Sequence, residues 1–197
     1  MAENKNNPEN VSVGKPMADG AVFAAPAGTA LPTDCKTALA ETFKCLGLIS
    51  EDGVSNEIET DSEEIKAWGG DVVLNPQTSR VEKYTFTMIE TNEQSLKVVF
   101  GDTNVTKTDD GFSVVHNGKE REERVYVIET IMSNGNIKRQ VIPRGKVSEI
   151  GEIVYKDDEA IGYETTITAL LDAEGNTAYE YIGKPAGAAA AKASVTK

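Results

Sequence analysis

Alternation of apolar and polar residues with a period of two dominates the second half of the chain. In residues 161–171, every second side chain from Ile161 to Leu171 belongs to one less polar set, while Gly162 and Glu164 begin the other. Such alternation is typical of a strand with one buried face. Asn117-Gly118 and Asn134-Gly135 stand between apolar runs and predict two tight hairpins. We therefore expect a mainly β chain of antiparallel hairpins.

One segment has the pattern of a helix. Thr91 or Asn92 can cap its start, Leu96, Val99 and Phe100 form an apolar stripe, and Gly101 can end it. This predicts one short helix over residues 91–101. Residues 35–46 are ambiguous and predict a short helix or a loop.

Residues 125–128, Val-Tyr-Val-Ile, place apolar side chains on both faces of a predicted strand. A strand of this kind is covered on two sides, either in a sandwich or by a neighbouring subunit.

The stretch from Cys45 to Asp71 is too polar for a core strand. We expect a turn at residues 50–53, a long exposed loop over 50–71, and contacts made by that loop. The single tryptophan, Trp68, precedes Gly69-Gly70. It either folds back on its own core or contacts another chain, since Trp is over-represented at interfaces.

A length of 197 residues favours one domain with extensions. We expect a flexible arm over residues 1–19, a domain over 20–183 and an alanine-rich disordered tail over 184–197. No apolar run approaches the roughly 20 residues of a membrane span. The first residues lack the pattern of a secretory signal, so we expect synthesis in a reducing cytosol.

Candidate chemistry is sparse. Cys35 and Cys45 are too far apart on a helix or strand for a local disulfide and predict buried free thiols. His116 is the only histidine and predicts a polar residue at a hairpin end. Residues 102–104 begin like a calcium loop, but Lys107 replaces the required glycine. We predict no catalytic residues, no metal and no cofactor.

The formal net charge is −12, which argues against a protein that grips nucleic acid. The same charge suits a surface past which DNA slides.

Four segments together carry a family resemblance: VFAAPAGTALPTD, LGLISEDGV, EEIKAWGGDVV and KVVFGDTNV. In this order and spacing the chain resembles the major tail tube protein of long-tailed bacteriophages, especially those of Gram-positive hosts. The similarity runs from about residue 20 to residue 182.

The resemblance implies two packed antiparallel sheets, a β-sandwich or split barrel, with one flanking helix. Six copies would form a ring, and stacked rings would form a hollow virion tube that conducts DNA. It also implies partners: other copies of the chain, a tape-measure protein in the lumen, and tail terminator and baseplate or distal tail proteins. No membrane partner is implied.

Carried over to this sequence, residues 1–19, 50–71 and 183–197 would contact neighbouring subunits and rings. In the loop, the expected interface residues are Glu51, Asp52, Ile58, Ile65, Trp68 and Asp71. Glu129 and Glu164 are candidates for acidic residues that face the lumen.

Two rival interpretations remain at this stage. One is the inner tube of a contractile tail or of a phage-like bacteriocin. The other is a host- or carbohydrate-binding β-sandwich, which requires exposed aromatic residues on one face.

Overall fold

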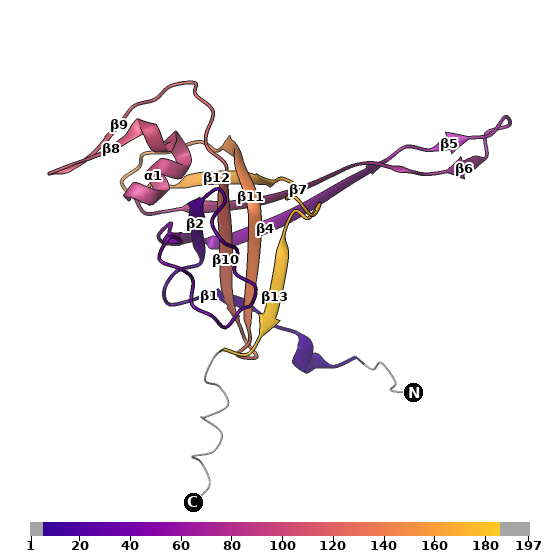
Figure 1. Cartoon of the computed structure of the whole chain (residues 1–197), viewed down its shortest axis with the longest axis horizontal. Coiled ribbons are helices and arrows are strands. Elements are labelled where there is room, and N and C mark those ends of the chain that lie inside the picture. Colours follow the sequence, from indigo (N-terminus) through magenta and orange to yellow (C-terminus); the bar gives the residue numbers. More distant parts are fainter. Residues whose placement is uncertain (1–5, 186–197) are drawn as a thin grey trace, which may run out of the picture.

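The computed structural model describes residues 6–185 of the chain (Figure 1). Thirteen strands, one α-helix and two short 3-10 helices lie in this range. The helices are η1 (Pro8–Asn10), α1 (Glu93–Phe100) and η2 (Asp102–Asn104). The strands are β1 (Gly14–Pro16), β2 (Val22–Pro26), β3 (Lys44–Cys45), β4 (Ile49–Ser62), β5 (Ile65–Lys66), β6 (Val72–Leu74), β7 (Gln77–Met88), β8 (Val105–Thr108), β9 (Gly111–Val114), β10 (Arg124–Met132), β11 (Ile137–Ile150), β12 (Tyr163–Ala169) and β13 (Tyr179–Gly183).

Nine strands form one antiparallel sheet with the order β3-β2-β10-β11-β12-β7-β4; in addition, β1 pairs with β10 and β13 pairs with β11. The sheet folds into two layers. The first layer contains β1, β2, β3, β10, β13 and the first part of β11, and the second contains the last part of β11 with β12, β7 and β4. Strand β11 belongs to both: its first part pairs with β10 and β13, and its last part, from Gly145, pairs with β12. Gly145 lies where the two parts meet, and an added Cβ would come within 2.5 Å of the Tyr126 ring. The sheet therefore changes neighbours at a position where only glycine fits.

The main core lies between these two layers. Tyr126 and Ile142 come from the first layer, Phe86 and Ile167 from the second, and Val99 from α1. The predicted fold, mainly β with two packed antiparallel layers and one short flanking helix, is confirmed. The two layers are parts of one continuous sheet.

Helix α1 begins and ends where the sequence predicts. The Asn92 side chain accepts hydrogen bonds from the backbone N–H groups of Gln94 and Ser95, and Gly101 is the C-cap residue. The helix is only eight residues long, so its buried face stabilises it more than its intrinsic propensity does.

A second, smaller core covers the opposite face of the first layer. Val125 and Val127 of β10 pack there with Phe23 and Phe43, and Leu39 packs at its edge. The segment after β2 thus covers the two-sided strand within the same chain. Residues 35–46 do not form a helix, because Phe43 enters the smaller core while Leu46 enters the main core.

A buried ion pair fastens this covering segment. Arg139 and Glu129 face each other across β11 and β10, and both are buried. Arg139 also donates to the carbonyl oxygens of Asp34 and Thr37, at 2.6 and 2.9 Å. Hydrogen bonds from the Thr37 backbone, the Thr37 hydroxyl and the Lys36 backbone lower the pKa of Asp34 to about 2.

One of the two predicted Asn-Gly hairpins forms. Asn134-Gly135 joins β10 to β11, with Gly135 at φ +81°. Asn117-Gly118 lies instead in a connection between β9 and β10, so that prediction is wrong. The Asn117 amide exchanges hydrogen bonds with the Asn104 side chain, which gives the residue a role outside a tight turn.

The predicted flexible arm over residues 1–19 includes β1, which pairs with the end of β10. That part of the arm therefore belongs to the sheet. The predicted disordered tail over residues 184–197 lies, after its first two residues, outside the described residues.

Candidate assembly surfaces

The most prominent surface is a long two-stranded arm. Strands β4 and β7 pair from Val54↔Phe86 to Ser62↔Gln77 and extend well beyond the sandwich (Figure 1). A second small hairpin, β5 with β6, forms the tip. The prediction of a long exposed loop over residues 50–71 is therefore wrong in its first part, because backbone pairing with β7 holds residues 54–62 as a strand. Most of this strand is exposed, as expected.

The predicted turn at residues 50–53 is an irregularity within β4. The pairing register shifts between Ile49 and Val54, and Glu51 and Asp52 lie exposed in the shift. The extra residues bend the strand at the point where the arm leaves the body.

The tip carries three of the six predicted contact residues. Ile65, Trp68 and Asp71 lie there, while Ile58 lies midway along the arm. The Trp68 side chain is fully exposed, with a relative exposure of 106%. Backbone hydrogen bonds from Ala67 to the Asp71 carbonyl and from Gly70 to the Ala67 carbonyl hold its turn, at 2.8 and 3.0 Å. In the single chain, Trp68 does not fold back on its own core.

The root of the arm is fixed by a buried carboxylate. Glu82 of β7 accepts hydrogen bonds from Tyr84 at 2.8 Å, Arg80 at 2.9 Å and Asn56 of β4 at 3.2 Å. The Thr177 hydroxyl, which lies just before β13, also donates to it. Burial alone would raise the pKa of the Glu82 carboxyl. The hydrogen bonds to the charged form, of which the one from Thr177 has the largest effect, together exceed the effect of burial and lower this pKa.

A second surface is the outer face of the layer formed by β4, β7, β12 and the end of β11. We call it the polar face. Its side chains alternate with the buried ones, and Thr85 and Thr166 share a hydrogen bond across it at 2.9 Å. Over the body of the molecule, charged side chains complete it: Glu57, Glu59, Lys83, Lys146, Glu149 and Glu164. Asp61 lies on the same side of β4, further out along the arm, and is not counted with the polar face.

The polar face is acidic. Four carboxylates stand against two lysines, a net charge of −2. Lys83 pairs with Glu59 at 3.0 Å, and this bond, with Glu57 and Glu149 nearby, raises the pKa of Lys83. Glu57, Glu149 and Glu164 make no ion pair within the described part of the chain.

This four-stranded layer has two open edges. β4 ends the strand order, with β7 as its only neighbour among the described strands. On the other side, pairing with β10 stops at Gly145, so residues 146–150 of β11 pair with β12 alone. Open edges of this kind are templates for strands from another chain.

The two predicted lumen residues differ in position. Glu164 is exposed on the polar face, whereas Glu129 is buried in the ion pair with Arg139. The prediction for Glu129 is wrong, because alternation on β10 directs its side chain under the covering segment. Glu57 and Glu149 share the polar face with Glu164 but were not predicted to lie there, because their common face depends on how several strands are paired.

The predicted chemistry-bearing residues lie apart. The His116 ring stacks on Phe100 with centroids 4.4 Å apart, and Asp102 pairs with Arg124. Cys35 and Cys45 carry free thiols; Cys35 is buried and Cys45 half-buried. No group of three or more potential metal ligands exists in the described range, and no helix there is long and apolar enough to span a membrane.

Comparison with known protein families gives a match that spans nearly the whole chain. A family model described as phage tail tube protein matches residues 5–194. A search of the curated proteins returns no match. Among solved structures, the chain is similar to one from the cryo-EM structure of the anti-feeding prophage cap, the tube terminating cap. That likeness has 9% identity, covers 93% of this chain and 100% of the other, and has a TM-score of 0.43.

Proposed function

The chain belongs to the phage tail tube protein family, and from this premise we propose that it builds the tail tube of a long-tailed bacteriophage as stacked hexameric rings. The ring count, the passage of DNA and the identity of the partners are parts of the proposal. The structural role in the tail follows from the family.

The observation that carries the proposal is the four-stranded layer with two open edges. If β4 of one copy pairs with residues 146–150 of the next, the backbone groups of one open edge bond to those of the opposite open edge on the neighbouring copy. Such head-to-tail contacts close into a ring when the rotation between neighbouring copies is a whole fraction of a full turn, and a closed ring leaves no unpaired edge. Several copies would thereby share one continuous barrel wall.

The polar face would line the lumen of this barrel. Its net charge of −2 per copy repels phosphate groups, and its threonines are neutral. DNA would therefore pass without being held. The same lumen would contain the tape-measure protein before ejection.

The arm would connect neighbouring subunits or rings. It extends beyond the body, and its tip exposes apolar side chains that a solitary soluble protein would normally cover. Glu51, Asp52, Ile58, Ile65, Trp68 and Asp71 are the proposed contact residues along it. Tail terminator and baseplate proteins would meet the two ends of the tube.

Electron microscopy and sedimentation of the purified chain test the proposal. Hollow rings or tubes of uniform width are expected on concentration. A variant in which Asn-Gly replaces residues 63–76 should fold but fail to form long tubes, because Ser62 and Gln77 are cross-strand partners that a two-residue turn can join.

Tyr155→Ala is the matched control, since Tyr155 is exposed and lies outside the arm and the polar face. It should assemble like the wild type. A chain that stays monomeric at all concentrations, or a tip-shortened variant that assembles normally, would contradict the proposal.

A further inference from the structure

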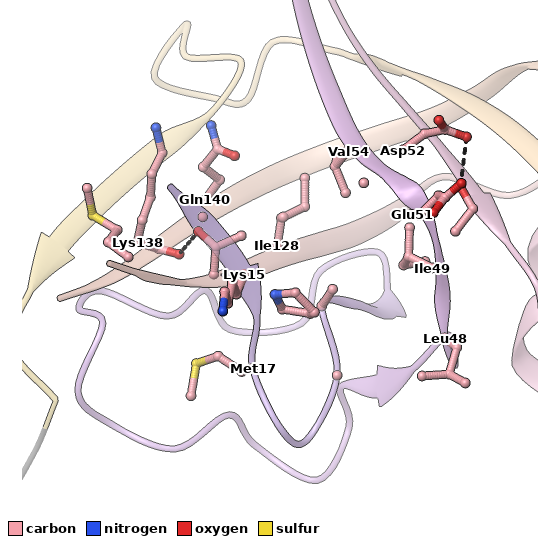
Figure 2. A pocket seen from close by; sticks show the side chains of 18 of the residues that line it. Lys15, Met17, Leu48, Ile49, Glu51, Asp52, Val54, Ile128, Lys138 and Gln140 are labelled. Atoms are coloured by element: carbon pink, nitrogen blue, oxygen red, sulfur yellow. Dashed lines mark hydrogen bonds between the residues drawn. The ribbon is translucent and has the colours of Figure 1, made fainter. Parts of the chain in front are cut away.

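A large cleft opens beside the root of the arm. Its volume is about 840 Å³, and it lies between β1, β10 and β11 on one side and residues 47–54 on the other. Figure 2 shows Met17, Leu48, Ile49, Val54 and Ile128 around it. Ile128 belongs to the main core and Val54 packs against it, so the cleft is an opening between the two layers that reaches the edge of the core.

The arm tip is an apolar surface without a partner. Trp68 projects from it, and Ile65, Val72, Val73 and Leu74 are each about half exposed or more. Apolar side chains gathered at the end of an ordered ribbon mark an interaction site. A Trp held in a hydrogen-bonded turn is also the kind of rigid anchor that fills an interface pocket.

The tip cannot enter the cleft of its own chain. The arm leaves the cleft at Val54 and stays paired with β7 to Ser62, which places the tip roughly 26 Å away at about 3.3 Å per residue. Folding it back would break that pairing. Only the tip of another copy can reach the cleft while the arm stays intact.

We propose that the cleft is the docking site for the arm tip of a second copy of this chain, with the Trp68 indole seated between Met17 and Leu48. This inference rests on the proposed tube, because assembly must bring the two copies together. It assigns the receiving surface, which the family match does not.

The charges around the two surfaces favour one orientation. The tip carries Glu63, Glu64 and Asp71 against Lys66, and Lys66 pairs with Glu64. On the β1 side of the cleft, Lys15 has no carboxylate partner among the described residues. Glu51 and Asp52 occupy the opposite rim (Figure 2). The acidic side of the tip would therefore face Lys15 and stay away from the β4 rim.

Fluorescence gives the first test, because Trp68 is the only tryptophan. Its emission should shift to shorter wavelength when tubes form, as the indole leaves water. Trp68→Ala should raise the concentration needed for assembly by about 30-fold or more, as expected for loss of an interface anchor. Tubes that form without a spectral shift would overturn the assignment and leave the tube itself intact.

Cysteine cross-linking gives the second test. A chain with Ala67→Cys, mixed with a chain carrying Leu48→Cys, should form a disulfide heterodimer when the two assemble in the presence of an added thiol oxidant. Adding Trp68→Ala to the first chain should abolish it. Leu171→Cys in place of Leu48→Cys is the control, because Leu171 is similarly exposed but lies outside the cleft.

Tubes with equal cross-linking to both positions, or with none, would refute the docking site alone. Cross-linking of Leu48→Cys to Ser194→Cys instead of Ala67→Cys would assign the cleft to the C-terminal segment and also refute it. Absence of any assembly would contradict the proposed function and this inference together.

Discussion

Replacement of Glu82 by alanine should loosen the root of the arm. The carboxylate joins β4, β7 and the segment before β13 through Asn56, Tyr84 and Thr177. Without the Glu82 carboxylate, the Tyr84 hydroxyl has no acceptor, and Tyr84 is only 1% exposed. Arg80 also loses its ion pair but is exposed enough to be rehydrated.

The magnitude follows from these contacts. An unsatisfied buried hydroxyl costs about 1–3 kcal/mol, and loss of a hydrogen bond to a charged group adds about 1.5 kcal/mol. We expect Glu82→Ala to lower the free energy of unfolding by about 3 kcal/mol. In a domain of this size that corresponds to a fall in Tm of roughly 6–12 °C.

Urea denaturation and thermal unfolding measure this effect. Glu59→Gln is the matched control, because Glu59 makes an exposed ion pair with Lys83 on the same arm. Such pairs contribute about 0–1 kcal/mol. If the free energy of unfolding of Glu82→Ala lies within 1 kcal/mol of the wild-type value, Glu82 does not fix the root of the arm. The same follows if Glu59→Gln loses as much stability as Glu82→Ala.

The same carboxylate predicts a pH dependence. Its pKa is lower in the folded chain than in the unfolded one, so its stabilisation is present above the unfolded pKa and is lost as pH falls through the folded pKa. Between pH 7 and strongly acidic pH, the wild type should lose more stability than Glu82→Gln does.

Three further predictions concern other parts of the molecule. Arg139→Met should lower the free energy of unfolding, measured in urea, by about 3–5 kcal/mol, because it leaves the buried Glu129 carboxylate without its ion-pair partner. Adding Glu129→Leu to the same chain should restore most of the lost stability. Gly135→Ala should cost about 1–2 kcal/mol, because Gly135 has positive φ, whereas Gly118→Ala should change stability by less than about 0.5 kcal/mol. Changing the three unpaired carboxylates of the polar face, Glu57, Glu149 and Glu164, to glutamine should make tubes retain short duplex DNA at low salt in co-sedimentation, and retention should disappear as salt rises. Equal DNA binding by wild-type tubes would contradict the role given to that face.

The fold was largely predictable because its signals are local. Alternation over residues 161–171, Asn92 with Gly101 at the helix ends, and Asn134-Gly135 each act within a few residues. The Asn117-Gly118 hairpin failed because a turn signal says nothing about whether the flanking residues have partners. The adjacent chain instead connects β9 to β10.

The candidate surfaces were less predictable because they depend on register. Residues 50–62 are polar, and a polar segment predicts a loop unless its partner strand is known. The exposure of the residues around Trp68 could be predicted from the sequence alone, and their contacts with another chain stay a prediction. Glu129 could not be separated from Glu164 in that way, because burial of one and exposure of the other follow from how the sheet is covered.

A cryo-EM reconstruction of the assembled tube would show directly which strands line its lumen. We expect β4, β7, β12 and the end of β11 to form the innermost wall, β4 of one copy to pair with residues 146–150 of the next, and Glu164 to face the lumen. An inner wall built from β2 and β10, or a wall in which the polar face points outward, would contradict this arrangement.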